Sequence, residues 1–321
     1  MRTRVDVSWL LRTFVADGLS ATGAYRPLQA LAGQLFGGFI LAFHDMGGER
    51  FREVIQSLSP GEPVHLSELV DRLRRGKSTQ GLFAITVDDG VRDTVQALSS
   101  VAQDLHWPVT FFLPTGYLDA PGGMAFQWLQ TILARVPRVR LDLRAGVVDL
   151  STELARQRFG HRVTARMYAR PAAEYLGLIE ELVSHAIARG WLSRERDAPP
   201  APVAWKDVTA LAAHPAIRFG SHGVTHIAAA ALHPDQLERE LRESQERISA
   251  HTGAPCRHFA YPFGGPESIG AVAPGLVAKY YDSAVTMSRG RLRNHSPFLL
   301  PRIPLYPRDS SAMARLKVLT S

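Results

Sequence analysis

Short apolar runs alternate with amphipathic helical patterns along much of the chain. The runs at 39–43, 82–87 and 109–113 are almost wholly apolar, which is typical of strands buried on both faces. Helical spacing of apolar residues lies between them, at 66–73 and 92–105. This alternation predicts an α/β fold, in which helices cover a parallel sheet or barrel.

The same alternation returns in the last third of the chain. It predicts a helix at 236–251 and strands at 217–220, 256–261 and 282–286. Pro234 near the first turn and Gly253 just past the end mark the limits of the helix. Because polar residues follow several of the strands, we expect the chemistry at their carboxyl ends.

Two stretches depart from this alternation and set the predicted domain organisation. Helix-like spacing at 7–15 and 27–36 predicts a helical extension over residues 1–36. Helical patterns also dominate residues 120–203, as at 174–189, and the proline-rich run 198–202 is typical of a linker. We therefore predict a barrel over 37–321, with an insertion or lid at about 120–203.

The composition fits a globular protein of enzyme size. The chain has 321 residues, 45% of them hydrophobic, and a formal net charge of +7. Only four lysines occur, so arginine supplies most of the positive charge. Arginine-rich coding in a GC-rich genome explains this, and attraction to anionic ligands or membrane surfaces is the alternative. No basic run with interleaved aromatic residues occurs, so we expect no nucleic-acid partner.

The cysteine content and the N-terminus bear on the compartment. Cys256 is the single cysteine, so an intrachain disulfide is impossible. Charged residues interrupt the N-terminal stretch, which therefore lacks the unbroken apolar run of a secretory signal. We expect a cytoplasmic protein, with peripheral contact with the inner membrane as an option.

The first chemical motif is a pair of adjacent carboxylates, Asp88 and Asp89, at the end of a predicted strand. Like charges repel in a partly buried site, and a divalent cation would relieve that cost for one of them. The other carboxylate would then be free to act as a base. The alternative is an ordinary surface turn, because Asp-Asp-Gly is common in loops.

The second motif places His222 and His226 four residues apart, directly after a predicted strand. Such a pair lies on one face if the segment is helical. Two imidazoles and a carboxylate suit zinc, cobalt, nickel or iron, whereas the alternative is a helix-capping histidine with a stray neighbour. Three protein ligands with open positions are what a hydrolytic metal site needs.

Taken in order, these motifs resemble the NodB-type polysaccharide deacetylase family. The resemblance covers about 39–303, apart from the insertion, and rests on the segments Thr86–Gly90, His222–His226, Phe259–Gly264, Thr110–Leu113 and Leu300–Ile303. It implies a distorted (β/α) barrel and a metal-dependent carbohydrate N-deacetylase, which releases acetate from an N-acetylated saccharide.

The resemblance also implies a role for each motif residue. Asp89, His222 and His226 would hold a divalent metal, zinc foremost, and Asp88 would be the general base that activates the attacking water. The backbone N–H near Phe263 would be a second donor to the oxyanion. The third motif would contact the substrate through Tyr261, Pro262, Phe263 and Gly264.

One position departs from the family pattern. The third motif usually carries an arginine two residues before its proline, and here that residue is Ala260. The arginine normally orients the catalytic aspartate. We hypothesise that Arg302 supplies the charge from another strand end, and the alternative is a surface or packing arginine.

The general acid is also not where the common pattern has it, because no late Leu-x-x-His motif occurs. His44 ends the first predicted strand and is our candidate to protonate the leaving amine. This resembles the circularly permuted branch of the family, which deacetylates poly-N-acetylglucosamine and similar exopolysaccharides. A buried histidine satisfied by Asp45 or by backbone is the alternative.

Three functions stay open at this point. The leading hypothesis is N-deacetylation of an amino-sugar glycan or glycan precursor. The same chemistry would serve an amide hydrolase with a non-sugar substrate. A non-catalytic glycan-binding protein that kept the fold is the third, although retention of both aspartates and both histidines disfavours it.

Overall fold

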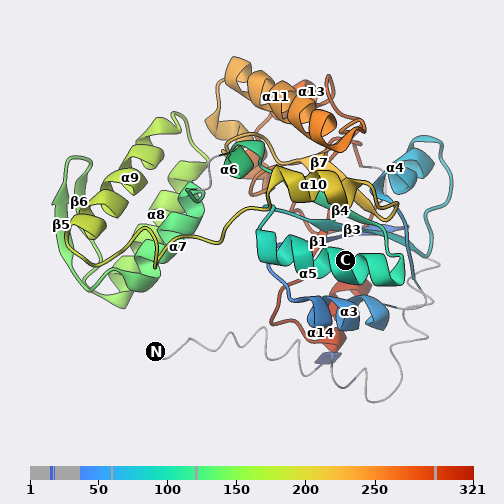
Figure 1. Ribbon diagram of the computed structural model, residues 1–321, viewed down its shortest axis with the longest axis horizontal. Coiled ribbons are helices and arrows are strands. Elements are labelled where there is room, and N and C mark those ends of the chain that lie inside the picture. Colours follow the sequence, from blue (N-terminus) through green and yellow to red (C-terminus); the bar gives the residue numbers. More distant parts are fainter. Residues whose placement is uncertain (1–14, 17, 19–36, 59–60, 120–121, 293–294) are drawn as a thin grey trace.

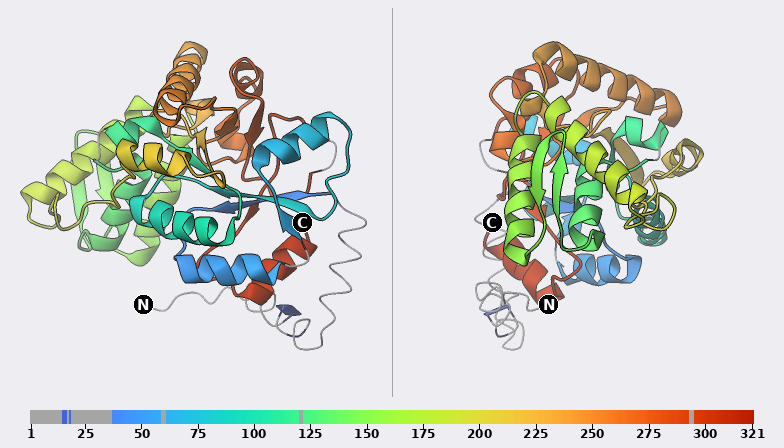
Figure 2. Two further views of the ribbon diagram at one scale, coloured as in Figure 1. Left: turned by 45° about the vertical axis from the view of Figure 1, so that its right-hand side comes forward. Right: turned by 90° about the vertical axis from the view of Figure 1, so that its left-hand side faces the viewer.

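The computed structural model describes residues 15–16, 18, 37–58, 61–119, 122–292 and 295–321. A barrel-like body carries a separate lobe at one side, and Figure 1 and the two views of Figure 2 show both parts. The helical extension predicted for 1–36 lies almost wholly outside the described residues. None of the helices in the described part of the chain combines the length and the apolar character needed to cross a bilayer.

The body is built on one curled sheet whose paired strands all run parallel. Its strand order is β10-β1-β3-β4-β7-β8-β9, and β2 pairs with β3 beside this path. Residues of β1 and β4 are buried throughout, as in a sheet covered on both faces. The strands are β1 (Phe39–Phe43), β2 (Glu62–Pro63), β3 (Leu82–Val87), β4 (Val109–Leu113), β7 (Ile217–Ser221), β8 (His258–Ala260), β9 (Ser283–Val285) and β10 (Ile303–Pro304).

The segment 300–304 joins the two edges of this curled sheet. Leu300 forms a parallel bridge with Val285 of β9, and three residues later Ile303 pairs with Leu41 of β1. The first and last strands of the chain are therefore neighbours. This places Arg302, just before β10, beside the carboxyl ends of β1 and β3.

Helices cover the outside of the sheet, with α3, α5 and α14 on one side and α11 and α13 on another (Figure 1). The 19-residue helix α11 starts with a proline in its first turn and ends at Gly253, whose φ of 67° is left-handed. The helices of the body are α3 (Gly48–Ser57), α4 (Leu66–Arg74), α5 (Arg92–Leu105), α6 (Thr115–Asp119), α10 (Trp205–Ala212), α11 (Pro234–Thr252), α12 (Pro266–Ile269), α13 (Ala273–Val277) and α14 (Ser311–Leu319), with a 3₁₀ turn, η1, at Ala229–Ala231.

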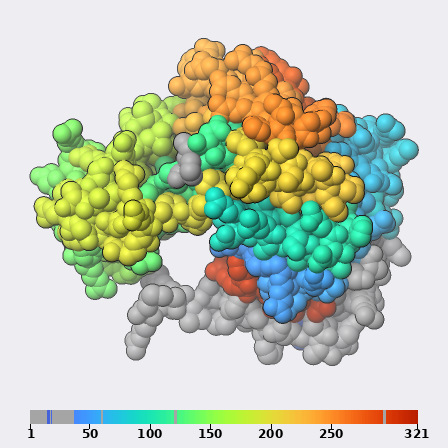
Figure 3. Space-filling model, viewed as in Figure 1, coloured from blue at the N-terminus to red at the C-terminus, as the bar shows by residue number. Residues whose placement is uncertain are grey.

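The lobe beside the body is formed by the insertion, and Figure 3 shows it as a separate bulge. It has a hydrophobic cluster of its own, to which Trp128, Phe159 and Leu182 belong. Its elements are α7 (Ala125–Arg135), β5 (Arg140–Leu143), β6 (Gly146–Asp149), α8 (Glu153–Met167) and α9 (Ala173–Ala188).

Helices make up most of the insertion, but β5 and β6 add an antiparallel hairpin that the sequence pattern did not predict. Leu141, Leu143 and Val148 are buried in the cluster of the lobe, whereas their neighbours along the two strands are more exposed. The carboxylate of Glu181 on α9 accepts hydrogen bonds from the two backbone N–H groups of the turn, at Arg144 and Ala145. This short hairpin lies among long helical patterns, which mask its period-2 signal.

The proline-rich run after the lobe packs against the loop that follows β3. The N–H of Arg92 donates to the carbonyl of Ala201 at 2.9 Å, and the N–H of Val203 donates to the carbonyl of Gly90 at 2.8 Å. Tyr117 donates its hydroxyl to the carbonyl of Pro200. The chain that leaves the lobe therefore holds the loop that carries the two aspartates.

Candidate active site

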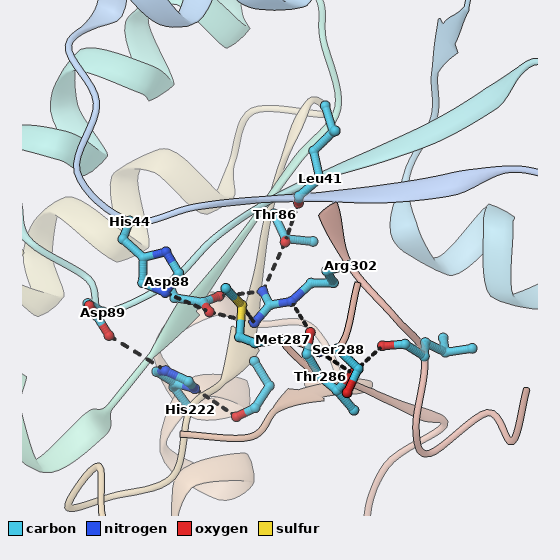
Figure 4. Close-up of polar contacts among 12 residues, drawn as sticks. Leu41, His44, Thr86, Asp88, Asp89, His222, Thr286, Met287, Ser288 and Arg302 are labelled. Carbon is cyan, nitrogen blue, oxygen red and sulfur yellow. Dashed lines mark hydrogen bonds and ion pairs between the residues drawn. The ribbon is translucent and has the colours of Figure 1, made fainter. Parts of the chain in front are cut away.

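Asp88 and Arg302 form a buried ion pair at the carboxyl ends of β3 and β1. Arg302 donates from both terminal nitrogens to the two carboxylate oxygens, at 2.8 and 2.6 Å. It also donates to the Thr86 hydroxyl at 3.0 Å and from Nε to the Thr286 carbonyl at 2.9 Å. Figure 4 shows this arrangement, in which the guanidinium is held on several sides. Arg302 and Asp88 are 0% and 1% exposed, so the surface-arginine alternative does not hold.

The charge of Arg302 keeps Asp88 ionised. Burial by itself raises the pKa of the Asp88 carboxyl, but the charges of Arg302 and His222 and the hydrogen bonds from Arg302 oppose it. The resulting pKa lies below its ordinary value. Asp88 is therefore a carboxylate with a fixed orientation, as a general base has to be.

Asp89, His222 and His226 bring three potential ligand atoms to one point. The Asp89 Oδ1 atom lies 3.6 Å from Nε2 of His222 and 3.3 Å from Nε2 of His226. Ligand atoms of the three residues lie within 4.8 Å of one another, and all three side chains are buried. One carboxylate and two imidazoles are a donor set that zinc and similar divalent ions accept, so these residues fit a metal.

The electrostatics of Asp89 and His226 agree with this fit. Burial lowers the pKa of His222, but contacts with Asp89 and Asp88 outweigh it and raise the pKa above its ordinary value. Burial raises the pKa of the Asp89 carboxyl, but hydrogen bonds with the two histidines hold it well below the ordinary value. Burial lowers the pKa of His226, and the opposing contacts with Asp89 do not restore it. Asp89 is thus an anion and His226 a neutral imidazole, which are the forms that bind metals.

A backbone contact orients His222. Its Nδ1 lies 2.7 Å from the carbonyl oxygen of Ala260, the residue where the family arginine is missing. A carbonyl oxygen only accepts, so Nδ1 carries the proton and the lone pair of a neutral ring is on Nε2, the atom nearer Asp89. Among the described residues, the buried Nδ1 of His226 has no hydrogen-bond partner.

The two histidines do not lie on a helix, so a helical face is not what brings them together. The segment after β7 is a loop, with a left-handed φ of 77° at Gly223 and 57° at His226. Its shape depends on Glu240 of α11, whose carboxylate accepts from the N–H groups of Val224 and Thr225 at 2.6 and 3.0 Å and from the Thr225 hydroxyl at 2.8 Å. The sequence alone gave no reason to single out Glu240.

His44 is a further neighbour of Asp88. Its Nε2 atom is 3.5 Å from Oδ2 of Asp88, and its side chain is 35% exposed. It is therefore neither a fully buried histidine nor one satisfied by Asp45. The partly exposed His44 side chain thus lies next to the Asp88 carboxylate, and Figure 4 shows the two side by side.

The third motif contributes a strained loop. Phe263 has a φ of 62°, which is uncommon for residues other than glycine. Asp89, in the loop after β3, shares this feature with a φ of 71°. The Phe263 N–H has no hydrogen-bond partner within the described part of the chain. A Cβ added at Gly264 would lie 2.6 Å from the backbone nitrogen of Met287, so only glycine fits there.

The four predicted substrate-binding residues are not equivalent. Tyr261 is 0% exposed and donates its hydroxyl to the carbonyl of Phe298, so its side chain belongs to the core and not to a substrate surface. Pro262 and Gly264 are also buried. Phe263 is partly exposed and lies against the His226 ring, with 5.0 Å between the ring centroids.

Comparisons with known proteins identify the family of the chain. The family model for polysaccharide deacetylases matches residues 75–269, which is more than half of the chain. No curated protein matches the sequence at a significant level.

Several solved structures have a similar fold. The Streptococcus pyogenes deacetylase PplD, in complex with acetate, aligns with a TM-score of 0.56 and 12% identity, over 86% of this chain and 94% of that one. IcaB from Ammonifex degensii gives 0.53 and 14%, over 88% and 97%. The BpsB deacetylase domain from Bordetella bronchiseptica gives 0.53 and 12%, over 83% and 95%. The predicted circular permutation stays a prediction. On its match to the family model, the chain belongs to the polysaccharide deacetylase family and is a hydrolase of carbohydrate acyl groups.

Proposed function

We propose that the protein removes an N-acetyl group from an amino-sugar glycan or glycan precursor in a metal-dependent reaction. The observation that carries this proposal is the different surroundings of two adjacent aspartates. Asp88 is held by the guanidinium of Arg302, and Asp89 faces the two imidazoles. One carboxylate is thus placed to act as a base, and the other to bind a cation.

The residues divide the work of amide hydrolysis. Asp88 accepts a proton from the attacking water, whose oxygen bonds to the carbonyl carbon. The Phe263 N–H donates to the carbonyl oxygen as that oxygen gains negative charge. His44 gives a proton to the nitrogen as the C–N bond breaks, so that acetate and a free amine result.

Asp89, His222 and His226 would hold the metal. A divalent ion bound there lowers the pKa of water and polarises the amide carbonyl. We propose zinc as the native ion because a His/His/carboxylate set with open positions is a common catalytic zinc site. Cobalt, nickel and iron are the alternatives to be tested.

The proposed location is the cytoplasm, with peripheral contact with the inner membrane. There the enzyme would meet nucleotide-linked or lipid-linked intermediates more often than finished polymer. The arginine-rich composition suits phosphorylated substrates of this kind. Fractionation of cells that express the full-length protein tests the location, and a periplasmic or secreted pool would contradict it.

The test of function is acetate release from a panel of N-acetylated monosaccharides, oligosaccharides and nucleotide sugars. Assays run without addition, with a chelator, and with zinc, cobalt, nickel or iron added back. We expect release that stops with chelator and returns with metal. Asp88→Asn should abolish it, and Asp93→Asn, the same change at an exposed position in α5, is the matched control.

Three outcomes would refute the proposal. Equal acetate release by the parent protein and Asp88→Asn would remove Asp88 from the chemistry. Binding of oligosaccharides with no release under any metal condition would favour the non-catalytic glycan-binding function. Activity on non-sugar amides alone would favour the amide hydrolase.

A further inference from the structure

A cavity of about 260 Å³ lies between the insertion lobe and the metal-binding residues. Helix α6, whose Tyr117 lines the cavity, lies where the lobe meets the body (Figure 1). The lobe contributes Phe126, Met167 and Leu176, and the body contributes Val224 and Phe263. These five side chains are apolar, and Tyr117, Tyr175, Thr225 and His226 add polar atoms to the lining. The apolar wall favours an apolar group over a hydroxyl-rich sugar face.

The cavity is next to the reaction centre, on one side only. His226 lines it, and the ring of His226 has Phe126 and Phe263 at centroid distances of 5.0 Å each. Asp88, His44 and Arg302 do not line the cavity. It therefore opens on the metal-ligand side of the site and away from the base and the acid.

The position of the cavity indicates which part of the substrate would enter it. During hydrolysis, the carbonyl carbon carries the attacking oxygen, the carbonyl oxygen, the leaving nitrogen and the acyl chain. The attacking oxygen faces Asp88, the nitrogen faces His44, and the carbonyl oxygen faces the Phe263 N–H. The acyl chain is the one substituent that none of these three groups faces, and the cavity beside His226 is free to receive it.

The cavity is much larger than an acetyl methyl group requires. A cavity that holds one water molecule, which is similar in size to a methyl group, needs only about 10–15 Å³. An acetyl group would therefore leave most of the 260 Å³ to water. A longer acyl chain would fill it and bury apolar surface from both partners.

We propose that this cavity is an acyl-chain pocket, and that the enzyme hydrolyses N-acyl groups longer than acetyl on amino sugars. The inference rests on the proposed function, because it uses the same base, acid and water. The C–N bond breaks, the water oxygen bonds to the acyl carbon, and the products are a fatty carboxylic acid and a free amine. No further reactant is needed.

The test compares glucosamine carrying N-acetyl, N-butanoyl or N-hexanoyl groups, with the metal-loaded full-length protein. Release of glucosamine, the common product, gives kcat/KM for each substrate. We expect kcat/KM to rise by about fourfold for each methylene that the pocket buries, until the pocket is filled. If kcat/KM stays constant or falls from acetyl to hexanoyl while the N-acetyl substrate is still hydrolysed, the acyl-chain pocket is refuted. The proposed function is not affected by that result.

A pair of variants sharpens the test. Leu176→Trp places a larger side chain at the cavity wall and should lower the ratio of hexanoyl to acetyl kcat/KM at least tenfold. Leu154→Trp is the matched control, because Leu154 lies in the same lobe and is 55% exposed. An equal ratio in the two variants would overturn the pocket.

Two further outcomes separate this proposal from its rivals. Octyl N-acetylglucosaminide carries its alkyl chain on the sugar side and not on the acyl group. If its kcat/KM exceeds that of N-acetylglucosamine while the longer N-acyl substrates fall below it, the cavity receives the sugar side and the acyl-chain pocket is refuted. If no amine is released from any substrate, the proposed function fails, and the pocket fails with it.

Discussion

Arg302 and Asp88 are 214 residues apart in the sequence, and the guanidinium of one donates to both carboxylate oxygens of the other. The register of β10 on β1 brings them together, because Leu41 pairs with Ile303, the next residue after Arg302. Arg302 thus brings to Asp88, from a different strand end, the positive charge that the third motif lacks at Ala260.

Arg302→Met should destabilise the protein by about 3–5 kcal/mol, because it leaves the Asp88 charge buried without a partner. The stability of Arg302→Lys should lie between those of the parent protein and Arg302→Met, since an ammonium keeps the charge but not the bidentate geometry. Urea unfolding measures the stability, and acetate release measures the activity. The double variant Asp88→Asn/Arg302→Met removes both charges and should be more stable than Arg302→Met alone. A parent-like stability of Arg302→Met would contradict the buried ion pair.

Glu240 should control metal affinity without being a ligand. Glu240→Gln weakens the three hydrogen bonds that shape the loop between His222 and His226. Loss of such supporting contacts typically costs about 10–100-fold in metal affinity. Zinc affinity, measured by competition with a chromogenic chelator, gives the effect. Glu246→Gln, an exposed position on the same helix, is the control, and equal affinities in the two variants would rule out this role.

His44 should matter most where the leaving group needs a proton. His44→Gln should lower the rate of N-acetyl hydrolysis by about 10²–10⁴-fold. Its effect on 4-nitrophenyl acetate should be much smaller, because 4-nitrophenolate leaves without protonation. His161→Gln, at an exposed position, is the control. If His44→Gln slows both reactions equally, His44 positions another group and is not the general acid.

The order of strands and helices could be predicted from the sequence because each buried strand is a short apolar run. Residues 92–105 and 109–113 form the expected helix and strand with the predicted limits. Asp88, Asp89 and His222 could be grouped because all follow parallel strands, whose carboxyl ends meet at one edge. The missing arginine also pointed to Arg302, since a buried aspartate requires a counter-charge.

Other features depend on contacts that no local pattern encodes. Glu240 supports the metal-binding loop from a helix whose sequence is that of an ordinary amphipathic surface helix. Tyr261 shares a motif with Phe263, but a motif does not tell which side chain points into the core. The loop of His222 and His226 follows from left-handed backbone at Gly223 and His226, whereas the four-residue spacing equally suits a helix.

His258 is a buried histidine for which we predict a pH effect on stability. Its Nε2 lies 2.8 Å from the hydroxyl of Ser67, and its Nδ1 lies 2.9 Å from the hydroxyl of Ser283. Burial lowers the pKa of His258 from 6.5 to about 4. The folded protein thus keeps this imidazole neutral at a pH where the unfolded chain protonates it.

The direction of the effect follows from proton binding. Between pH 6.5 and about 4 the unfolded state binds the extra proton, so the contribution of His258 to stability is complete above pH 6.5 and is lost as the pH falls to about 4. This loss is on the order of 3 kcal/mol. His258→Gln retains hydrogen-bonding groups but does not titrate, so its unfolding free energy should fall less steeply than that of the parent over this range. Urea unfolding at a series of pH values measures both slopes, with the exposed His161→Gln as the control. Parallel curves for the parent and His258→Gln would show that the burial of this histidine does not govern the acid sensitivity of the fold.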